Sequence, residues 1–105
     1  MDNSRKALNL LGLAEKAGKL ASGEFQTETA VKKGRAYLAV IAEDASENTR
    51  KKFRSMCEYR NVPCSVRFRK EELGRAAGKD LRSSMAVLDE HLAAAFRKAA
   101  GREEE

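Results

Sequence analysis

The stretch YLAVIA, Tyr37 to Ala42, decides the fold class. It is a continuous apolar run that contains valine and isoleucine, which is typical of a strand covered on both faces. A second run, SMAVLD at residues 84–89, has the same character. Residues with the three- and four-residue apolar spacing of amphipathic helices lie before, between and after these runs. Helices that alternate with buried strands indicate an α/β protein.

The remaining segments complete this pattern. The segment CSVRF alternates, with Cys64, Val66 and Phe68 on one face and Ser65 and Arg67 on the other, so we expect a strand with one solvated face near a sheet edge. Residues 37–68 then form a right-handed βαβ crossover. We predict an α/β fold, a three-layer α/β/α sandwich with a small mixed sheet. The expected helices cover residues 5–17, 24–33, 46–60, 70–77 and 90–100, and a short strand covers 19–21.

Length and composition set limits on the class of protein. The chain has 105 residues, 42% of them hydrophobic, which suits one core. We therefore expect one domain over residues 1–100 and an acidic C-terminal tail over 101–105. No apolar run approaches the roughly 20 residues that span a bilayer, which predicts no membrane association. The start MDNSRK lacks a signal-peptide pattern, so a cytoplasmic location is expected.

The charge balance points to an anionic partner. Net charge is +5, and it is +8 without the three terminal glutamates. Nucleic acid is the leading partner for a basic domain of this size, although many basic proteins carry only solvated lysines. Part of the positive charge is concentrated near the C-terminal strand, at Arg67, Arg69, Lys70, Arg75, Lys79 and Arg82.

No set of residues predicts catalysis. Cys57 and Cys64 lack metal-clip spacing and are expected to be reduced thiols, and His91 is the single histidine. The acids Glu43 and Asp44 follow a buried strand, as in phosphoryl-handling proteins, but helix capping accounts better for Asp44. Phosphate-loop, dinucleotide, zinc-protease and nucleophile-elbow motifs are absent. We expect no catalytic residues, no metal and no cofactor.

The segment ASGEFQTETAVKKGRA contains a short helix bracketed by Gly23 and Gly34. Its polar start has two interpretations. Gly23 or the preceding serine caps the helix, or the N–H groups of residues 24–26 point at a phosphate or base outside the protein. We expect this helix start to meet the AEDAS turn and the GKDLRS loop at one edge of the sheet, where ligands of α/β proteins bind.

Taken together, SGEFQTETAVKKGRAYLAVIAEDAS, CEYRNVPC and ELGRAAGKDLRSSMAVL resemble the ribosomal protein L7Ae/L30e superfamily of RNA-binding proteins, in particular its small bacterial branch. The resemblance covers residues 8–92. It implies a non-catalytic, ribosome-associated RNA binder whose relatives bind kink-turns. It also implies that Gly23 is the family glycine, that Gln26 stands where a glutamate contacts a guanine, and that Ser46 lies near a third contact. The loop 79–82 would enclose a flipped-out nucleotide.

Two residues depart from the kink-turn pattern. Phe25 replaces the asparagine that precedes the glutamate, and Thr29 replaces a lysine three residues beyond it. Gln26 still offers a donor and an acceptor, and Phe25 can stack on an unpaired base. A protein-interaction module on the same fold is the alternative. The predicted RNA-binding residues are Ser22, Gly23, Glu24, Phe25, Gln26, Thr29, Lys33, Arg35, Ser46, Lys79, Asp80, Leu81 and Arg82.

Overall fold

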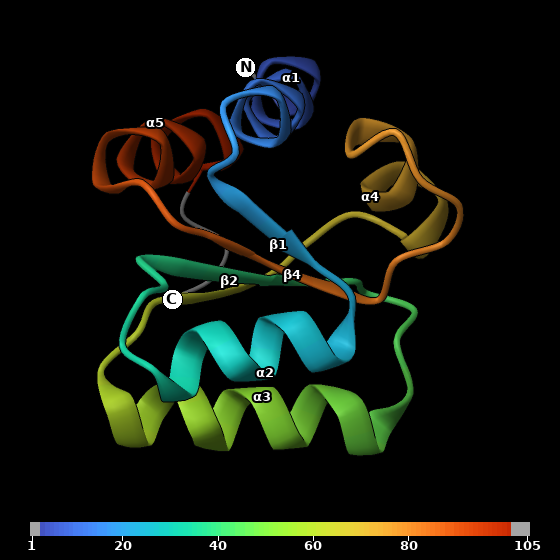
Figure 1. Ribbon diagram of the computed structural model, residues 1–105. Coiled ribbons are helices and arrows are strands. Elements are labelled where there is room, and N and C mark those ends of the chain that lie inside the picture. The colour runs from blue at the N-terminus through green and yellow to red at the C-terminus, as the bar shows by residue number, and fades with distance from the viewer. Residues whose placement is uncertain (1–2, 102–105) are drawn as a thin grey trace.

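The computed structural model describes residues 3–101 and consists of five helices around a four-stranded sheet (Figure 1). The acidic tail predicted for residues 101–105 lies, except for Gly101, outside the described residues. In chain order the elements are α1 (Ser4–Lys16), β1 (Leu20–Ser22), α2 (Glu24–Lys32), β2 (Leu38–Ile41), α3 (Glu47–Arg60), β3 (Cys64–Val66), α4 (Lys70–Ala76), β4 (Ser84–Val87) and α5 (Glu90–Ala100).

The sheet is mixed, as predicted. Its strand order is β1-β4-β2-β3, with β2 parallel to β3, and β4 antiparallel to both β1 and β2. Helices α2 and α3 cover one face, whereas α1, α4 and α5 cover the other (Figure 1). All residues of β2 and β4 are buried, because these two central strands have a helical layer on each side. The three-layer α/β/α sandwich is confirmed.

Large side chains from both helical layers fill the space against the sheet. Phe53 of α3 and Phe96 of α5 are fully buried, on opposite sides of the central strands. The ring of Phe68 packs edge-to-face on Phe96, with 6.2 Å between the ring centroids. Within the described residues, no helix has both the length and the apolar character needed to cross a membrane.

The prediction of a solvated face on β3 is wrong. Ser65, expected to face water, is 2% exposed, whereas Cys64 and Val66 are only partly buried. The strand does lie at a sheet edge, but the protein covers both of its faces, so the alternating pattern does not mark a solvent-facing side. Arg67 also folds back onto the protein, where its guanidinium donates hydrogen bonds to the carbonyl oxygen of Ala100 and to Ser4 Oγ.

Gly74 holds the loop before β4 against α4. The N–H of Lys79 donates to the carbonyl oxygen of Gly74 over 2.8 Å, and the backbone of Asp80 crosses directly above this glycine. A Cβ at position 74 would stand 1.4 Å from the Asp80 carbonyl oxygen. Because backbone cannot yield as a flexible side chain can, only glycine permits this crossing.

Replacing Gly74 by alanine should therefore displace loop 79–82 and destabilise the protein by about 1–3 kcal/mol, the usual range for overpacking. Urea unfolding measures the loss. Gly12→Ala is the matched control, because this helical glycine has one neighbour, the Ala76 carbonyl oxygen, at 3.2 Å and alanine favours helix. Equal stability of Gly74→Ala and wild type would contradict the role assigned to the crossing.

Candidate nucleic-acid interface

The start of α2 is open to an external ligand. Gly23 has φ 105° and ψ 156°, and no side chain caps the helix. The first N–H groups of a helix, here those of Glu24, Phe25 and Gln26, have no acceptor within the helix and carry its positive dipole end. A Cβ placed on Gly23 would meet no atom within 4 Å. Gly23 is therefore required by its left-handed backbone, and its missing side chain leaves the helix start accessible.

Three loops meet at this edge of the sheet, as predicted (Figure 1). The N–H of Gly23 donates to the Ser84 carbonyl oxygen over 2.9 Å, which joins the start of α2 to the start of β4. The N–H of Ala42 donates to the carbonyl oxygen of Ser83, also over 2.9 Å. This hydrogen bond joins the end of β2 to the loop before β4. Backbone hydrogen bonds thus fix the three loops relative to one another.

Asp44 caps a helix, but not the helix that follows it in the chain. Its Oδ1 accepts the Lys70 N–H of α4 over 2.8 Å, and Arg69 Nη2 lies 3.6 Å from its Oδ2. The Lys70 N–H and then the nearby positive charges lower the pKa of Asp44 below its ordinary value. The cap of α3 is Ser46, whose Oγ accepts the Thr49 N–H over 3.1 Å. The expectation that Asp44 caps a helix is thus met at α4, and Ser46 rather than Asp44 caps α3.

The predicted site residues differ in accessibility. Phe25 is 74% exposed and Leu81 is 60% exposed, so both large apolar side chains are accessible to a ligand. Gln26 is also exposed, whereas Thr29 is partly buried. Arg82 is partly buried, its Nη1 donates to the Leu81 carbonyl oxygen over 2.9 Å, and its buried Nε has no partner among the described residues. The remaining loop residues, Lys79 and Asp80, are exposed.

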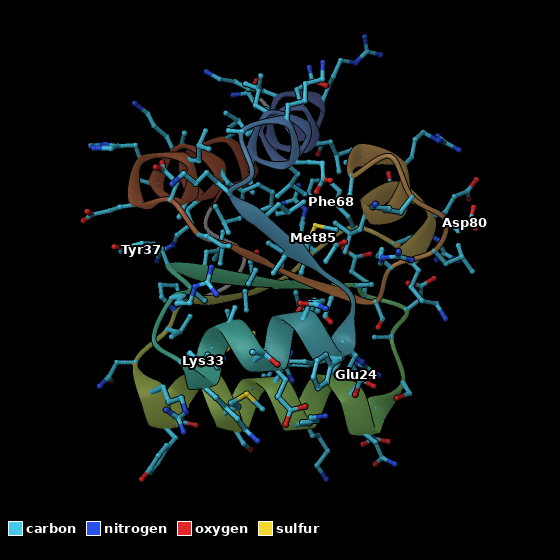
Figure 2. The ribbon with its side chains drawn as sticks, viewed as in Figure 1. Glu24, Lys33, Tyr37, Phe68, Asp80 and Met85 are labelled. Atoms are coloured by element: carbon cyan, nitrogen blue, oxygen red, sulfur yellow. The ribbon has the colours of Figure 1, made fainter. Side chains whose placement is uncertain are left out.

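Lys33 and Arg35 do not belong to this cluster. Both come after the last residue of α2, and a nine-residue helix places its ends about 13 Å apart. Figure 2 shows Lys33 and Glu24 at opposite ends of the helix. The predicted basic run is also divided, because Arg69 pairs with Asp44 and Arg75 pairs with Glu71 at 3.0 Å.

An ion cluster beside the start of α2 was not predicted. Lys52 of α3 lies 3.2 Å from a carboxylate oxygen of Glu24 and 2.8 Å from one of Glu28. Glu28 also pairs with Lys32 at 2.8 Å, and these two lysines lower its pKa to about 2. No local sequence pattern indicates the contacts between α2 and α3, because Lys52 is distant in the chain from Glu24 and Glu28 and its partners depend on helix packing.

The sequence and the fold were compared with those of known proteins. Residues 5–96 match the model of the "Ribosomal protein L7Ae/L30e/S12e/Gadd45 family". The chain belongs to this family. It is 43% identical over 77 residues to "RNA-binding protein YlxQ" of Enterococcus faecium, covering 73% of this chain and 75% of the relative. It is 42% identical over 84 residues to the protein of the same name in Bacillus subtilis (strain 168), covering 80% of this chain and 84% of the relative.

Two solved structures share the fold of this chain. A Bacillus halodurans protein described as having unknown function superposes with a TM-score of 0.87 at 35% identity, over 90% of this chain and 96% of that one. The "Giardia lamblia 15.5kD RNA binding protein" superposes with a TM-score of 0.81, over 93% and 87% of the two chains. At 22% identity the second likeness concerns the fold alone.

Removing the Glu28 carboxylate should change the pH dependence of stability. The pKa of Glu28 is lowered from 4.5 to about 2 in the folded protein, so its contribution is present above pH 4.5 and disappears as the pH falls toward 2. We expect Glu28→Gln to be less stable than wild type at pH 7, with the difference shrinking through that window. Urea unfolding at several pH values measures it.

Glu58→Gln is the control for this experiment. Glu58 is exposed on α3, and its carboxylate has no ion pair among the residues described. The free energy of unfolding of Glu58→Gln should therefore differ little from that of the wild-type protein at pH 7. A Glu28→Gln difference that stayed constant between pH 7 and pH 2 would show that the carboxylate charge does not stabilise the fold.

Proposed function

We propose that the protein is a non-catalytic RNA-binding protein that holds structured RNA at the edge where α2 begins. We call this edge the Gly23 surface and define it by residues 22–26, Thr29, Ser46 and residues 79–82. The observation that carries the proposal is the open start of α2: among residues 3–101 no side chain caps its first N–H groups, and a Cβ on Gly23 would meet no atom within 4 Å. The names of the YlxQ relatives support RNA as the ligand.

Backbone groups would supply the first contacts. A phosphate or base oxygen that approaches over Gly23 can accept hydrogen bonds from the N–H groups of Glu24, Phe25 and Gln26, and the helix dipole favours negative charge there. The side-chain amide of Gln26 can donate to and accept from a base edge. The exposed ring of Phe25 provides a stacking surface for an unpaired base.

The loop before β4 would contribute the second group of contacts. Lys79 is exposed beside Leu81, and the partly buried Arg82 adds a second positive charge to the same loop. Cations that reach phosphates position an RNA without reading its sequence, whereas Leu81 and Phe25 can pack on bases. The hydrogen bond from Gly23 to Ser84 holds the loop beside the helix start, so one RNA can contact both.

Kink-turn or ribosomal RNA is the class of ligand that family membership favours, and we propose a cytoplasmic, ribosome-associated role on the same ground. The alternative, a protein-interaction module whose exposed arginines meet an acidic protein, has less support from the charges. Two of the arginines that would meet such a partner, Arg69 and Arg75, already pair with carboxylates. Co-purification of RNA that nuclease treatment removes would favour RNA, and partners that persist after nuclease would favour the alternative.

Gly23→Glu should greatly weaken binding to structured RNA, because a side chain and a negative charge would occupy the path of the RNA backbone. Like charges at an interface cost several kcal/mol. Gly18→Glu is the matched control, since Gly18 also has a positive φ, at 72°, and open space around it, but lies at the end of α1. Gel shift measures affinity, and circular dichroism checks that both variants fold. Unchanged binding by folded Gly23→Glu would place the RNA elsewhere.

The departures at Phe25 and Thr29 predict weak binding to a standard kink-turn. The double variant Phe25→Asn with Thr29→Lys should strengthen kink-turn binding by about 1–3 kcal/mol. The first substitution adds an amide for a base edge, and the second adds a phosphate contact. End-to-end fluorescence transfer on a labelled kink-turn reports affinity and bending, and a straight duplex is the control. Tight bending by the wild-type protein would show that Phe25 and Gln26 recognise the kink-turn in another way.

A further inference from the structure

A second group of exposed aromatic and basic residues lies at the opposite edge of the sheet from Gly23. We call it the Tyr59 patch and define it by Lys33, Arg35, Tyr37, Tyr59 and Arg60. Tyr59, near the end of α3, is 83% exposed, and Tyr37, just before β2, is 48% exposed. Figure 2 shows Tyr37 and Lys33 at one end of the molecule, with Glu24 and Asp80 at the other.

Specific contacts hold the centre of this patch together. The guanidinium carbon of Arg60 lies 5.8 Å from the centroid of the Tyr59 ring, within the range of a cation–π contact. Nη1 of Arg60 also donates to the Lys32 carbonyl oxygen over 3.1 Å, which joins the end of α3 to the end of α2. Tyr59 and Arg60 are therefore held next to Lys33 even though they are far apart in the sequence.

The charge of the patch is positive and largely unpaired. No carboxylate in residues 3–101 lies within ion-pair distance of Lys33, Arg35 or Arg60, and Lys33 and Arg35 are exposed. The nearby Lys32 is paired with Glu28, and Glu58 is the exposed acid beside Tyr59. Lys33, Arg35 and Arg60 thus give this end of the protein three cations that pair with no carboxylate of residues 3–101, and Arg60 lies against the accessible ring of Tyr59.

We propose that the Tyr59 patch binds single-stranded RNA next to the structured RNA held at the Gly23 surface, an inference that rests on the proposed function. Exposed rings between cations are the arrangement by which proteins hold unpaired nucleotides, with bases on the rings and phosphates on the cations. Paired bases are stacked inside a duplex and cannot reach the rings, so the patch selects unpaired strands.

The arrangement suits RNA better than a protein partner. Protein interfaces also use tyrosine and arginine, but they are depleted in lysine and desolvated at their centre, whereas Lys33 is exposed in this patch. The five residues of the patch include no aliphatic side chain, and both tyrosines are accessible beside charged groups that remain hydrated. The separation of the two surfaces is also small, because α2, which joins them, is about 13 Å long. A single RNA can reach from one surface to the other.

The test measures binding of an oligouridine of about 12 nucleotides, a length within the range that single-strand binding modules cover. Fluorescence anisotropy compares wild type with Tyr59→Ala, Tyr59→Phe and Lys33→Glu. Lys6→Glu is the matched control, because Lys6 is exposed on α1 in the opposite helical layer. We expect Tyr59→Ala to weaken binding about tenfold, as loss of one stacked base does. Tyr59→Phe should bind as wild type, Lys33→Glu should bind more weakly, and Lys6→Glu should change little.

Several results would overturn the proposal. Unchanged affinity of Tyr59→Ala would exclude the patch, and a Tyr59→Phe affinity as low as that of Tyr59→Ala would exclude stacking. An affinity for duplex RNA equal to that for oligouridine, and lost equally in Tyr59→Ala, would exclude selection of single strands. Loss of polyglutamate binding in these variants, with oligouridine binding intact, would identify an acidic protein as the ligand instead.

The Gly23→Glu variant separates this proposal from the proposed function. It should lose structured RNA and keep oligouridine. A wild-type protein that bound structured RNA but not oligouridine would refute the Tyr59 patch alone, whereas binding of oligouridine without structured RNA would refute the Gly23 surface alone. Binding of neither RNA would refute both.

Discussion

Strand β4 runs antiparallel to both β1 and β2, and this pairing determines where the candidate interface lies. Ser22 at the end of β1 pairs with Met85, and Ile41 at the end of β2 pairs with Ser84. The ends of β1 and β2 are therefore beside the start of β4. Helix α2 begins immediately after β1, and loop 79–83 immediately precedes β4, so the helix start and the loop must meet at one edge of the sheet.

Contacts around this edge fix the loops and leave the helix start open. Gly74 lets the loop backbone cross α4, and the Asp44 carboxylate joins the turn after β2 to the start of α4. Lys52 connects α2 to α3 through Glu24 and Glu28. The N–H groups at the start of α2, by contrast, have no side-chain partner within the described part of the chain. A rigid surrounding with exposed donors at its centre is the arrangement expected of a binding site that is formed before the ligand arrives.

The sequence was sufficient for the architecture because its strongest patterns are local. The apolar runs at 37–42 and 84–89 identified the two central strands, and helical spacing identified the helices around them. The alternation of CSVRF was misleading, since Ser65 is a small hydroxyl residue whose size permits burial and whose type suggests exposure. No local pattern shows that helices cover both faces of an edge strand.

The candidate site was only partly predictable for a related reason. Gly23 and the loop 79–82 are recognisable as a helix start and a turn, so their meeting followed from the fold. The predicted RNA-binding residues also included Lys33 and Arg35, which follow the last residue of α2 and so lie at the opposite end of this helix from Gly23. Charge pairing depends on packing, and the sequence therefore did not show that Asp44 caps α4.

Contact between RNA and the start of α2 can be detected by titrating 15N-labelled protein with a kink-turn RNA and following the backbone amide signals. We expect the largest shifts on Gly23 to Gln26 and on residues 79–82, because those N–H groups would gain acceptors or new neighbours. Saturable binding with shifts confined to other parts of the protein, and none in these two segments, would contradict it.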